Sequence, residues 1–228
     1  GYLPGALTNY LALLGWNPGG DVEKFDLAFL IKHFDLPRVG KSNSKFDREK
    51  LFRFNADAIA AMPPEVFRGA LREHFAAAHP EYLERLDDHA FDTFAEVYRP
   101  RSRTLSEPAQ LGRFFIVDDY AITYDELDKN ARKAVQKNDG VGLKHLAAFR
   151  DVLATECDPW SGEKAHELLQ RYCEQHEVGM GAVAQPIRVA VSGGTVTPGI
   201  DQTLEILGRE RTLKRIGNCL NALSPHDE

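Results

Sequence analysis

The sequence has few of the features that mark a membrane, secreted or metal-binding protein. Its three cysteines among 228 residues are widely spaced, with neither the spacing of a zinc site nor the density of a disulfide framework. No stretch approaches the roughly 20 consecutive apolar residues that cross a bilayer, and no secretory signal pattern is present. We therefore expect a cytoplasmic protein without a membrane partner, in which Cys157, Cys173 and Cys219 are small core residues.

Local signatures of catalysis are also missing. No GxxxxGK[ST] phosphate loop occurs, and His166-Glu167 lacks the second histidine that a zinc-binding helix needs. The eight histidines are scattered, and no serine or cysteine lies in a nucleophile pattern. The sequence therefore predicts no catalytic residue, no metal site and no bound cofactor in this chain.

Basic charge and strand patterns are equally scarce. The formal net charge is −6, which argues against a general nucleic-acid binder. A site-specific RNA binder can still be acidic overall when its basic residues gather on one face. β-branched residues rarely alternate with polar ones, and apolar residues recur at helical spacing instead, so we predict an all-α fold.

Turn residues divide this helical pattern into segments. Met62-Pro63-Pro64 is a clear break and a candidate domain boundary, because proline disfavours helix before it and suits a helix start. Asp47 is a good helix N-cap, and Asp158-Pro159-Trp160-Ser161 should cap a later helix. We expect helices over residues 6–16, 26–34, 65–78, 80–86, 90–98, 106–116, 124–137 and 143–155, with Leu7, Tyr10, Leu11, Leu14, Phe25, Leu27, Leu30, Phe34, Phe46, Leu51 and Phe54 facing inward.

The most informative stretch is a rigid break between two apolar helical runs, within residues 181–216. Ser192-Gly193-Gly194 should stop the first run, because glycine supplies the left-handed conformation that follows many helix ends. Thr197-Pro198-Gly199 should then bend the chain before Ile200 restarts the helical pattern. The residues expected on the apolar face of the first run are Val183, Ile187, Ala190 and Val191.

Basic side chains flank this corner. Arg188 precedes it, and Arg209, Arg211, Lys214 and Arg215 follow soon after. A rigid polar corner beside guanidinium groups suits a ligand that has phosphates and base edges. An ordinary helix–turn–helix corner with solvated arginines explains the same composition.

A second basic segment is Arg99-Pro100-Arg101-Ser102-Arg103, which follows a predicted helix. Positive charge at a helix C-terminus is favoured by the helix dipole, which is one explanation. Contact with a base or phosphate is the other, because a guanidinium can donate two parallel hydrogen bonds to one base edge. Lys41 and Lys45, in a serine-rich loop, are either RNA backbone contacts or solvated lysines.

Three strings carry a resemblance to a known family. AQPIRVAVSGGTVTPGI followed by LEILGRERTLKRI resembles the C-terminal helical domain of bacterial-type glutamyl-tRNA synthetases, where this corner sits against the tRNA anticodon loop. GYLPGALTNYLALLGW looks like the segment that follows the lysine-serine signature loop of these class I enzymes. The run from Arg38 to Leu51 is similar to a later family element of the RVxKSxxxFDxEKL kind.

The resemblance implies a division of labour along the chain. Residues 1–63 would be the end of the stem-contact region, and residues 64–123 and 124–228 the two helical subdomains that bind the anticodon. Arg101, or Arg99 or Arg103 at a shift of two residues, would read the third anticodon base, and an arginine there implies a preference for glutamate over glutamine tRNA. Arg188 would read the first two bases, in a pocket shaped by Thr197, Pro198, Gly199 and Ile200, and the implied backbone contacts are Lys41, Lys45, Arg103, Arg209 and Arg211.

The resemblance also implies which partners and chemistry to expect. The partner would be tRNA(Glu), and the chain would act as a monomer. Glutamate activation with ATP and Mg²⁺ would occur in an upstream catalytic half, so the chain alone, a fragment, should be catalytically inactive. The competing interpretation is a helical protein-interaction scaffold without specific RNA binding, which the acidic balance supports.

Overall fold

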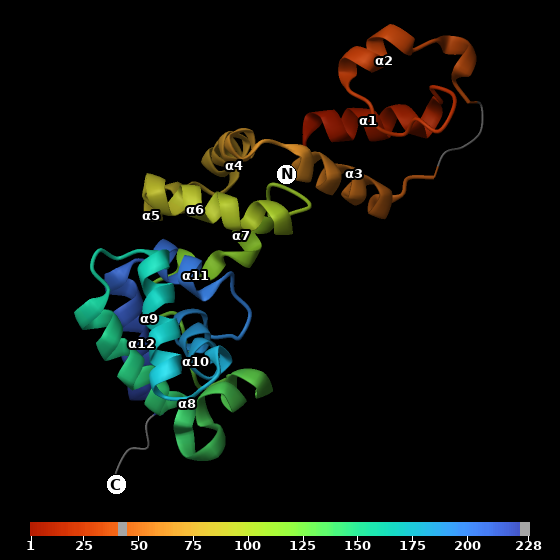
Figure 1. Cartoon of the computed structure of the whole chain (residues 1–228). Coiled ribbons are helices and arrows are strands. Elements are labelled where there is room, and N and C mark those ends of the chain that lie inside the picture. The colour runs from red at the N-terminus through yellow and green to blue at the C-terminus, as the bar shows by residue number, and fades with distance from the viewer. Residues whose placement is uncertain (41–44, 224–228) are drawn as a thin grey trace. The chain divides into compact units, whose positions relative to one another are not determined.

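A computed structural model describes residues 1–40 and 45–223, except for the side chains of residues 138 and 139 (Figure 1). Every regular element in these residues is a helix, which confirms the predicted all-α class. The chain forms two compact units: unit 1 is Gly1–Leu83 with Ala95–Leu111, and unit 2 is Glu84–Phe94 with Gly112–Glu228. These units are defined by packing, so the predicted functional ranges 1–63, 64–123 and 124–228 stay predictions.

Unit 1 is built on helices that begin where the turn residues predict. Asp47 caps α3, because its carboxylate accepts a hydrogen bond of 3.1 Å from the backbone N–H of Lys50. Met62 and Pro63 separate α3 from α4, and Tyr10, Leu51 and Phe54 form one part of the core. The elements are α1 (Pro4–Gly15), α2 (Leu27–His33), α3 (Arg48–Ala61), α4 (Pro64–Ala78), α5 (Pro80–Arg85), α6 (Asp88–Tyr98) and α7 (Glu107–Leu111), of which α5 and α6 run across the boundary between the two units.

Several apolar residues of unit 1 do not face inward as predicted. The exposed fractions are 37% for Leu7, 50% for Leu11, 57% for Leu27, 49% for Phe34 and 50% for Phe46. Helix α2 contains no buried residue at all. Periodicity identifies the apolar face of a helix, but it does not show that another part of the same chain covers that face.

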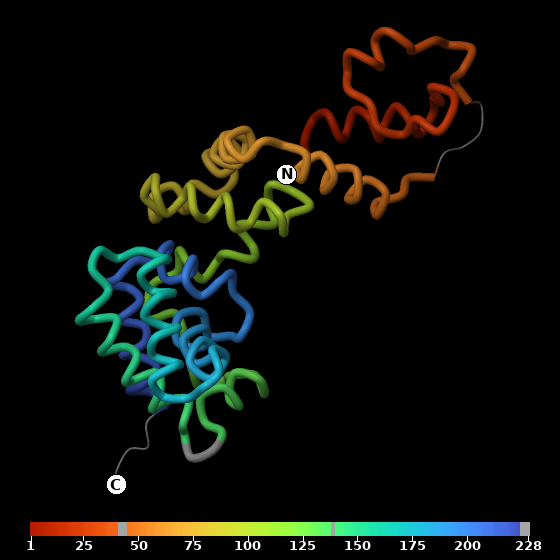
Figure 2. Tube along the Cα trace, viewed as in Figure 1, coloured from red at the N-terminus to blue at the C-terminus, as the bar shows by residue number. Residues whose placement is uncertain are grey.

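Unit 2 is a bundle in which α8 (Lys129–Glu156) packs against α9 (Gly162–Gln175), α10 (Met180–Ser192) and α12 (Arg209–Leu223), as the green to blue trace of Figure 2 shows. The short α11 (Ile200–Leu207) packs against α9 and α12. Ser161 caps α9, as predicted, by accepting a hydrogen bond from the backbone of Lys164. The predicted apolar face of α10 is confirmed, because Val183, Ile187, Ala190 and Val191 are all 0% exposed, and the cysteines at 157, 173 and 219 are buried and unpaired.

The two helices predicted over residues 124–137 and 143–155 form one element, α8, that starts later. Its N-cap is Asp128, whose carboxylate accepts hydrogen bonds from the backbone of Asn130 and Ala131. Tyr124 lies before the helix, and its buried hydroxyl donates to the carbonyl of Ala190 at 2.8 Å. The predicted break is still visible inside α8 as Gly140, whose φ of 71° lies in the left-handed region.

The helix predicted over residues 106–116 is also divided. It becomes α7 and a short 3-10 turn, Arg113–Phe115, with Gly112 between them. Glycine weakens a helix interior, and Phe115 is instead fully buried in unit 2. Within the described part of the chain, no helix has the length and apolar character needed to span a membrane.

Candidate nucleic-acid interface

The first predicted site lies where α6 ends in a 3-10 turn, Arg99–Arg101. The Arg99 guanidinium donates from Nη1 to the carbonyls of Ala60 and Met62, at 3.3 Å each. These carbonyls belong to the last turn of α3 and its C-cap, which have no partners within the helix. Arg99 therefore closes the end of α3 through Nη1, whereas its Nε is buried and has no hydrogen-bond partner in the described part of the chain.

Arg101 is exposed on the same turn and forms no hydrogen bond or ion pair with any residue that the structure describes. Its positive charge acts on the buried Tyr98, whose pKa is raised by burial and lowered in part by Arg101. Positive charge at the C-terminal end of a helix is favoured by the helix dipole. The guanidinium of Arg101 is therefore exposed, and its role in reading a base stays a prediction.

Arg103 has a different role. It forms an ion pair of 2.8 Å with Glu107, and its guanidinium lies 5.1 Å from the ring centre of Phe52. The hydrogen bond and the charge of Glu107 raise the pKa of Arg103. The backbone carbonyl of Arg103 accepts a hydrogen bond from Asn55, a buried residue that the sequence analysis did not single out. The segment is therefore anchored on both sides of Arg101.

The second predicted site is the corner after α10. Gly193 has φ 76° and its N–H donates to the carbonyl of Val189 at 2.8 Å, so it ends the helix as predicted. Arg188 donates from Nε to the Thr197 hydroxyl at 3.1 Å and from Nη2 to the Pro198 carbonyl at 3.4 Å. The structure thus brings Arg188, Thr197 and Pro198 together, and the arginine braces the corner from within.

The rest of the corner contains both buried and exposed residues. Pro198 is buried, and Ile200, at the start of α11, is 7% exposed. A Cβ at Gly199 would lie 2.5 Å from a carboxylate oxygen of Asp201, so the chain passes close to the first turn of α11. Val196 is 89% exposed at the tip. Pro198 and Ile200 therefore pack inside the corner, and Val196 is its exposed residue.

The residues predicted to contact the RNA backbone differ in exposure and in how many of their hydrogen-bonding groups already have a partner. Lys41 lies outside the described residues, and Lys45 is exposed. Arg209 is exposed but donates to the carbonyl of Ala154 at 2.5 Å, near the end of α8. Arg211 is only 18% exposed, and it pairs with Asp119 at 3.1 Å while donating to two backbone carbonyls. The geometry favours a structural role for Arg211 and leaves little of it for RNA.

Arg215, which the sequence analysis counted among the basic residues beside the corner, is 0% exposed. Its Nε lies 2.8 Å from a carboxylate oxygen of Asp119. It also donates to the carbonyls of Phe114, Val117 and Val191, at 2.8, 2.9 and 2.6 Å. Arg215 therefore holds α12, the end of α10 and the loop before Asp119 together, and it does not face a ligand.

Asp119 is the anion of this buried cluster and is 7% exposed. Burial by itself would raise the pKa of Asp119, but hydrogen bonds and positive charges from Arg215 and Arg211 together lower it. Nearby, burial raises the pKa of Tyr124, so that its hydroxyl stays a donor. Within the described residues, no group of histidine, cysteine, aspartate and glutamate side chains could hold a metal ion.

Arg101 and Arg188 belong to different compact units, unit 1 and unit 2. Each site is therefore built by its own set of contacts. Of the two, Arg101 has the freer guanidinium, whereas Arg188 presents a corner that it also stabilises. Both arrangements suit hydrogen bonding to an unpaired polynucleotide, because guanidinium and backbone groups can reach exposed base edges.

Comparisons with known proteins give the family and the fold that this chain resembles. The family model of an anticodon binding domain matches residues 68–220. The fold is similar to a glutamate tRNA ligase from Elizabethkingia meningosepticum, solved in complex with its amino acid, at 24% identity and a TM-score of 0.79 over 98% of this chain and 42% of that one. A glutamate-tRNA synthetase from Elizabethkingia anophelis gives 24% identity and a TM-score of 0.76 over 97% and 41%.

The chain spans less than half the length of either ligase, and at this identity the likeness shows a shared fold. The family match is broader evidence, because it covers more than half of this chain and includes Arg101, Arg188 and the whole corner. Residues 1–67 lie before the matched range, so the stem-contact role of residues 1–63 stays a prediction. By the extent of that match, the chain belongs to the family of anticodon-binding domains.

Proposed function

We propose that this chain is the anticodon-reading part of a glutamyl-tRNA synthetase and binds the unpaired anticodon loop of tRNA(Glu). The observation that carries the proposal is the family match over residues 68–220, which contains both predicted base-reading sites. The similarity in fold to two glutamate-tRNA ligases supports glutamate as the amino acid of the proposed synthetase. In the cytoplasm, the chain would act as a monomer.

Arg101 is the proposed reader of the third anticodon base. Its guanidinium is exposed and has no partner in the part of the chain that the structure describes, and the turn beneath it is anchored by Arg99 and Arg103. A guanidinium that donates two hydrogen bonds to one base edge discriminates by about 1–3 kcal/mol. Arg188, Thr197 and Pro198 would present the corner that reads the first two bases.

The bond-making steps would belong to the part of the ligases that this chain does not span. ATP and Mg²⁺ would be bound there, and the residues described here offer no cluster of metal ligands. We therefore expect no ATP–pyrophosphate exchange by this chain alone. Measurable exchange would show that the chain carries its own active site.

Binding of tRNA(Glu) and of transcripts with altered anticodons tests the proposal. Arg101→Gln should relax the preference at the third base by about 10- to 100-fold, because one bidentate contact is lost. Arg48→Gln is the matched control, since it removes the same charge from an exposed position on α3. Equal third-base preference in the native chain and Arg101→Gln would refute the role of Arg101.

The ionic-strength dependence separates RNA binding from the scaffold alternative. Contacts with phosphates release counterions, so affinity for tRNA(Glu) should fall steeply as salt rises. A helical protein-interaction scaffold would show no specific affinity for any anticodon at any salt concentration. That result would overturn the proposed function as a whole.

A further inference from the structure

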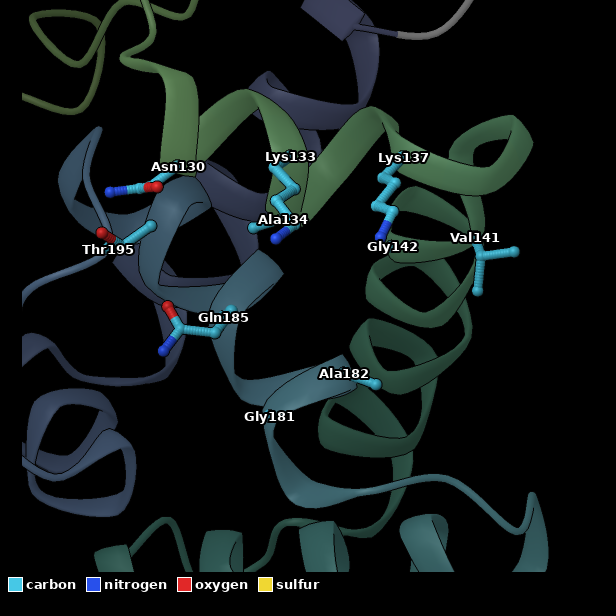
Figure 3. Close-up of a pocket in the computed structure, with 10 residues that line it drawn as sticks. All are labelled: Asn130, Lys133, Ala134, Lys137, Val141, Gly142, Gly181, Ala182, Gln185 and Thr195. Atoms are coloured by element: carbon cyan, nitrogen blue, oxygen red, sulfur yellow. The ribbon is translucent and has the colours of Figure 1, made fainter.

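A cavity of about 420 Å³ lies in unit 2 between α8 and α10. Its volume is in the range of small-ligand sites, about 300–1,000 Å³. Figure 3 shows Lys133 and Lys137 reaching from α8 toward the first turn of α10, at Gly181 and Ala182. The side chain of Gln185 lies at the other side of the cavity. The cavity thus has a basic side and an amide side.

The basic side suits a phosphate group. Lys133 and Lys137 are exposed, and neither forms a hydrogen bond or ion pair with a group that the structure describes, the side chains of residues 138 and 139 being outside that description. Opposite them, Gly181 and Ala182 lie in the first turn of the 13-residue α10, whose N-cap Gly179 offers no side-chain acceptor. The N–H of Ala182 donates to the Gly179 carbonyl at 2.8 Å, so the groups that add to the two ammonium charges are the N–H of Gly181 and the positive end of the helix dipole.

On the amide side of the cavity, one hydrogen-bond acceptor has no donor. The Oε1 atom of Gln185 is buried and has no partner among the described residues. A buried acceptor without a partner costs free energy, and a rotation of the Gln185 amide that turns Oε1 into the cavity would let a donor on the ligand satisfy it. The edge of a nucleobase supplies such donors, and the NH₂ of the same amide can meet an acceptor on that edge.

The cavity also adjoins the corner described above. Thr195 lines the cavity, and two residues later Thr197 accepts the hydrogen bond from Arg188. Arg188 is not one of the lining residues, and its Nε and Nη2 are engaged in the corner. For a base bound in this cavity, Gln185 is therefore better placed than Arg188 to form a hydrogen bond.

We propose that this cavity binds one unpaired ribonucleotide, with its phosphate against Lys133 and Lys137 and its base edge on Gln185. The RNA source, the anticodon loop of the tRNA, rests on the proposed function. A free nucleoside monophosphate has the same chemistry, so the experiments include both. Gln185 is then a specificity-determining residue in addition to Arg101 and Arg188.

The phosphate half of the proposal is tested by charge removal in the full chain. The double variant Lys133→Gln/Lys137→Gln should weaken tRNA(Glu) binding at least about 10-fold. It should also reduce the slope of log Kd against log salt concentration by about 0.7, the value for one phosphate on a single strand. Lys144→Gln is the control, an exposed lysine of α8 outside the cavity. A double variant that behaves like this control refutes the phosphate site.

The base half is tested by Gln185→Leu, with tRNA transcripts altered at each position of the anticodon loop. Discrimination at one position should fall about 10- to 100-fold, while the third-base preference assigned to Arg101 is kept. The Tm should not fall, because leucine removes a buried polar atom that has no partner. Exposed Gln170→Leu in α9 is the control. An unchanged preference at every loop position overturns the assignment of Gln185.

Mononucleotides separate the cavity from the proposed function. Amide NMR shifts of Gly181, Ala182 and Gln185 should follow titration with AMP, CMP, GMP or UMP, and the corresponding nucleosides should bind more weakly. If the native chain binds no tRNA but shows these shifts, the proposed function fails and the cavity is a mononucleotide site. If tRNA binds while the cavity variants match their controls, the cavity proposal fails and the proposed function stands. Absence of both tRNA binding and shifts overturns both.

Discussion

Replacing Asp119 by asparagine should destabilise unit 2 strongly, because it leaves a buried cation without its counterion. Arg215 is 0% exposed, and its one anionic partner in the described structure is Asp119, at 2.8 Å. Three backbone carbonyls accept its other hydrogen bonds, but they carry no net charge. Asparagine keeps the shape of the side chain and an oxygen acceptor, so the change is mainly electrostatic.

The size of the effect follows from burial. Breaking a buried ion pair by removing one partner costs about 3–5 kcal/mol, and the retained acceptor in asparagine places the loss near about 3 kcal/mol. Arg211 and Lys214 also face Asp119, but they are 18% and 59% exposed, so solvent screens much of their share. At about 2–4 °C per kcal/mol, the Tm should fall by roughly 6–12 °C.

The assay needs a signal from unit 2 alone. The chain has two tryptophans, and Trp160 lies in unit 2, where its ring N–H donates to the carbonyl of Leu204 at 3.0 Å. In a Trp16→Phe background, urea unfolding followed by tryptophan fluorescence reports unit 2. Asp118→Asn is the matched control, because Asp118 is 53% exposed and pairs with Arg85 at 3.3 Å, which predicts a loss below about 1 kcal/mol. Equal losses for the two variants would refute the reasoning.

Four further predictions concern single groups. Folding lowers the pKa of Asp119, so its contribution to the free energy of unfolding is complete above the unfolded pKa of about 3.9 and is lost as the pH falls through the lower folded value. The difference in unfolding free energy between the native chain and Asp119→Asn should therefore shrink in acid. Urea unfolding at a series of pH values from about pH 7 to pH 3 measures this difference. Gly193→Ala should cost about 1–2 kcal/mol of unfolding free energy, because φ is 76° there. Cys219 should react with a thiol reagent only on unfolding, since it is 0% exposed and burial raises its pKa to about 12. Asp47→Ala should cost unit 1 about 1 kcal/mol in thermal unfolding, through the lost cap of α3.

Local sequence rules predicted the parts of the fold that depend on neighbours in the chain. The apolar face of α10 follows from a period of 3.6 residues, and its end follows from the freedom of Gly193 to adopt positive φ. Asp47 and Ser161 were identifiable as caps because a short side-chain oxygen before a helical pattern has one obvious use. The exposed Arg101 was identifiable for the same reason, since the turn that presents it is local.

Contacts between distant residues were not predictable in this way. Nothing around Arg215 distinguishes a buried arginine from a solvated one, because its partners Phe114 and Val191 are far away in sequence. Lys133 and Gln185 face one cavity from two helices, and no motif links them. In α2, the apolar pattern gave no sign that its residues are left uncovered by this chain.

The order in which the chain visits its two units limits how it can be dissected. It leaves unit 1 after Leu83, returns at Ala95 within α6, and leaves again after Leu111. Phe94, which meets Phe115 edge-on at 5.8 Å inside unit 2, would be missing from any product that starts at Gly112. A single cut or a shortened gene therefore cannot release either unit whole, and the two proposed anticodon-reading sites have to be separated by point substitutions in the intact polypeptide.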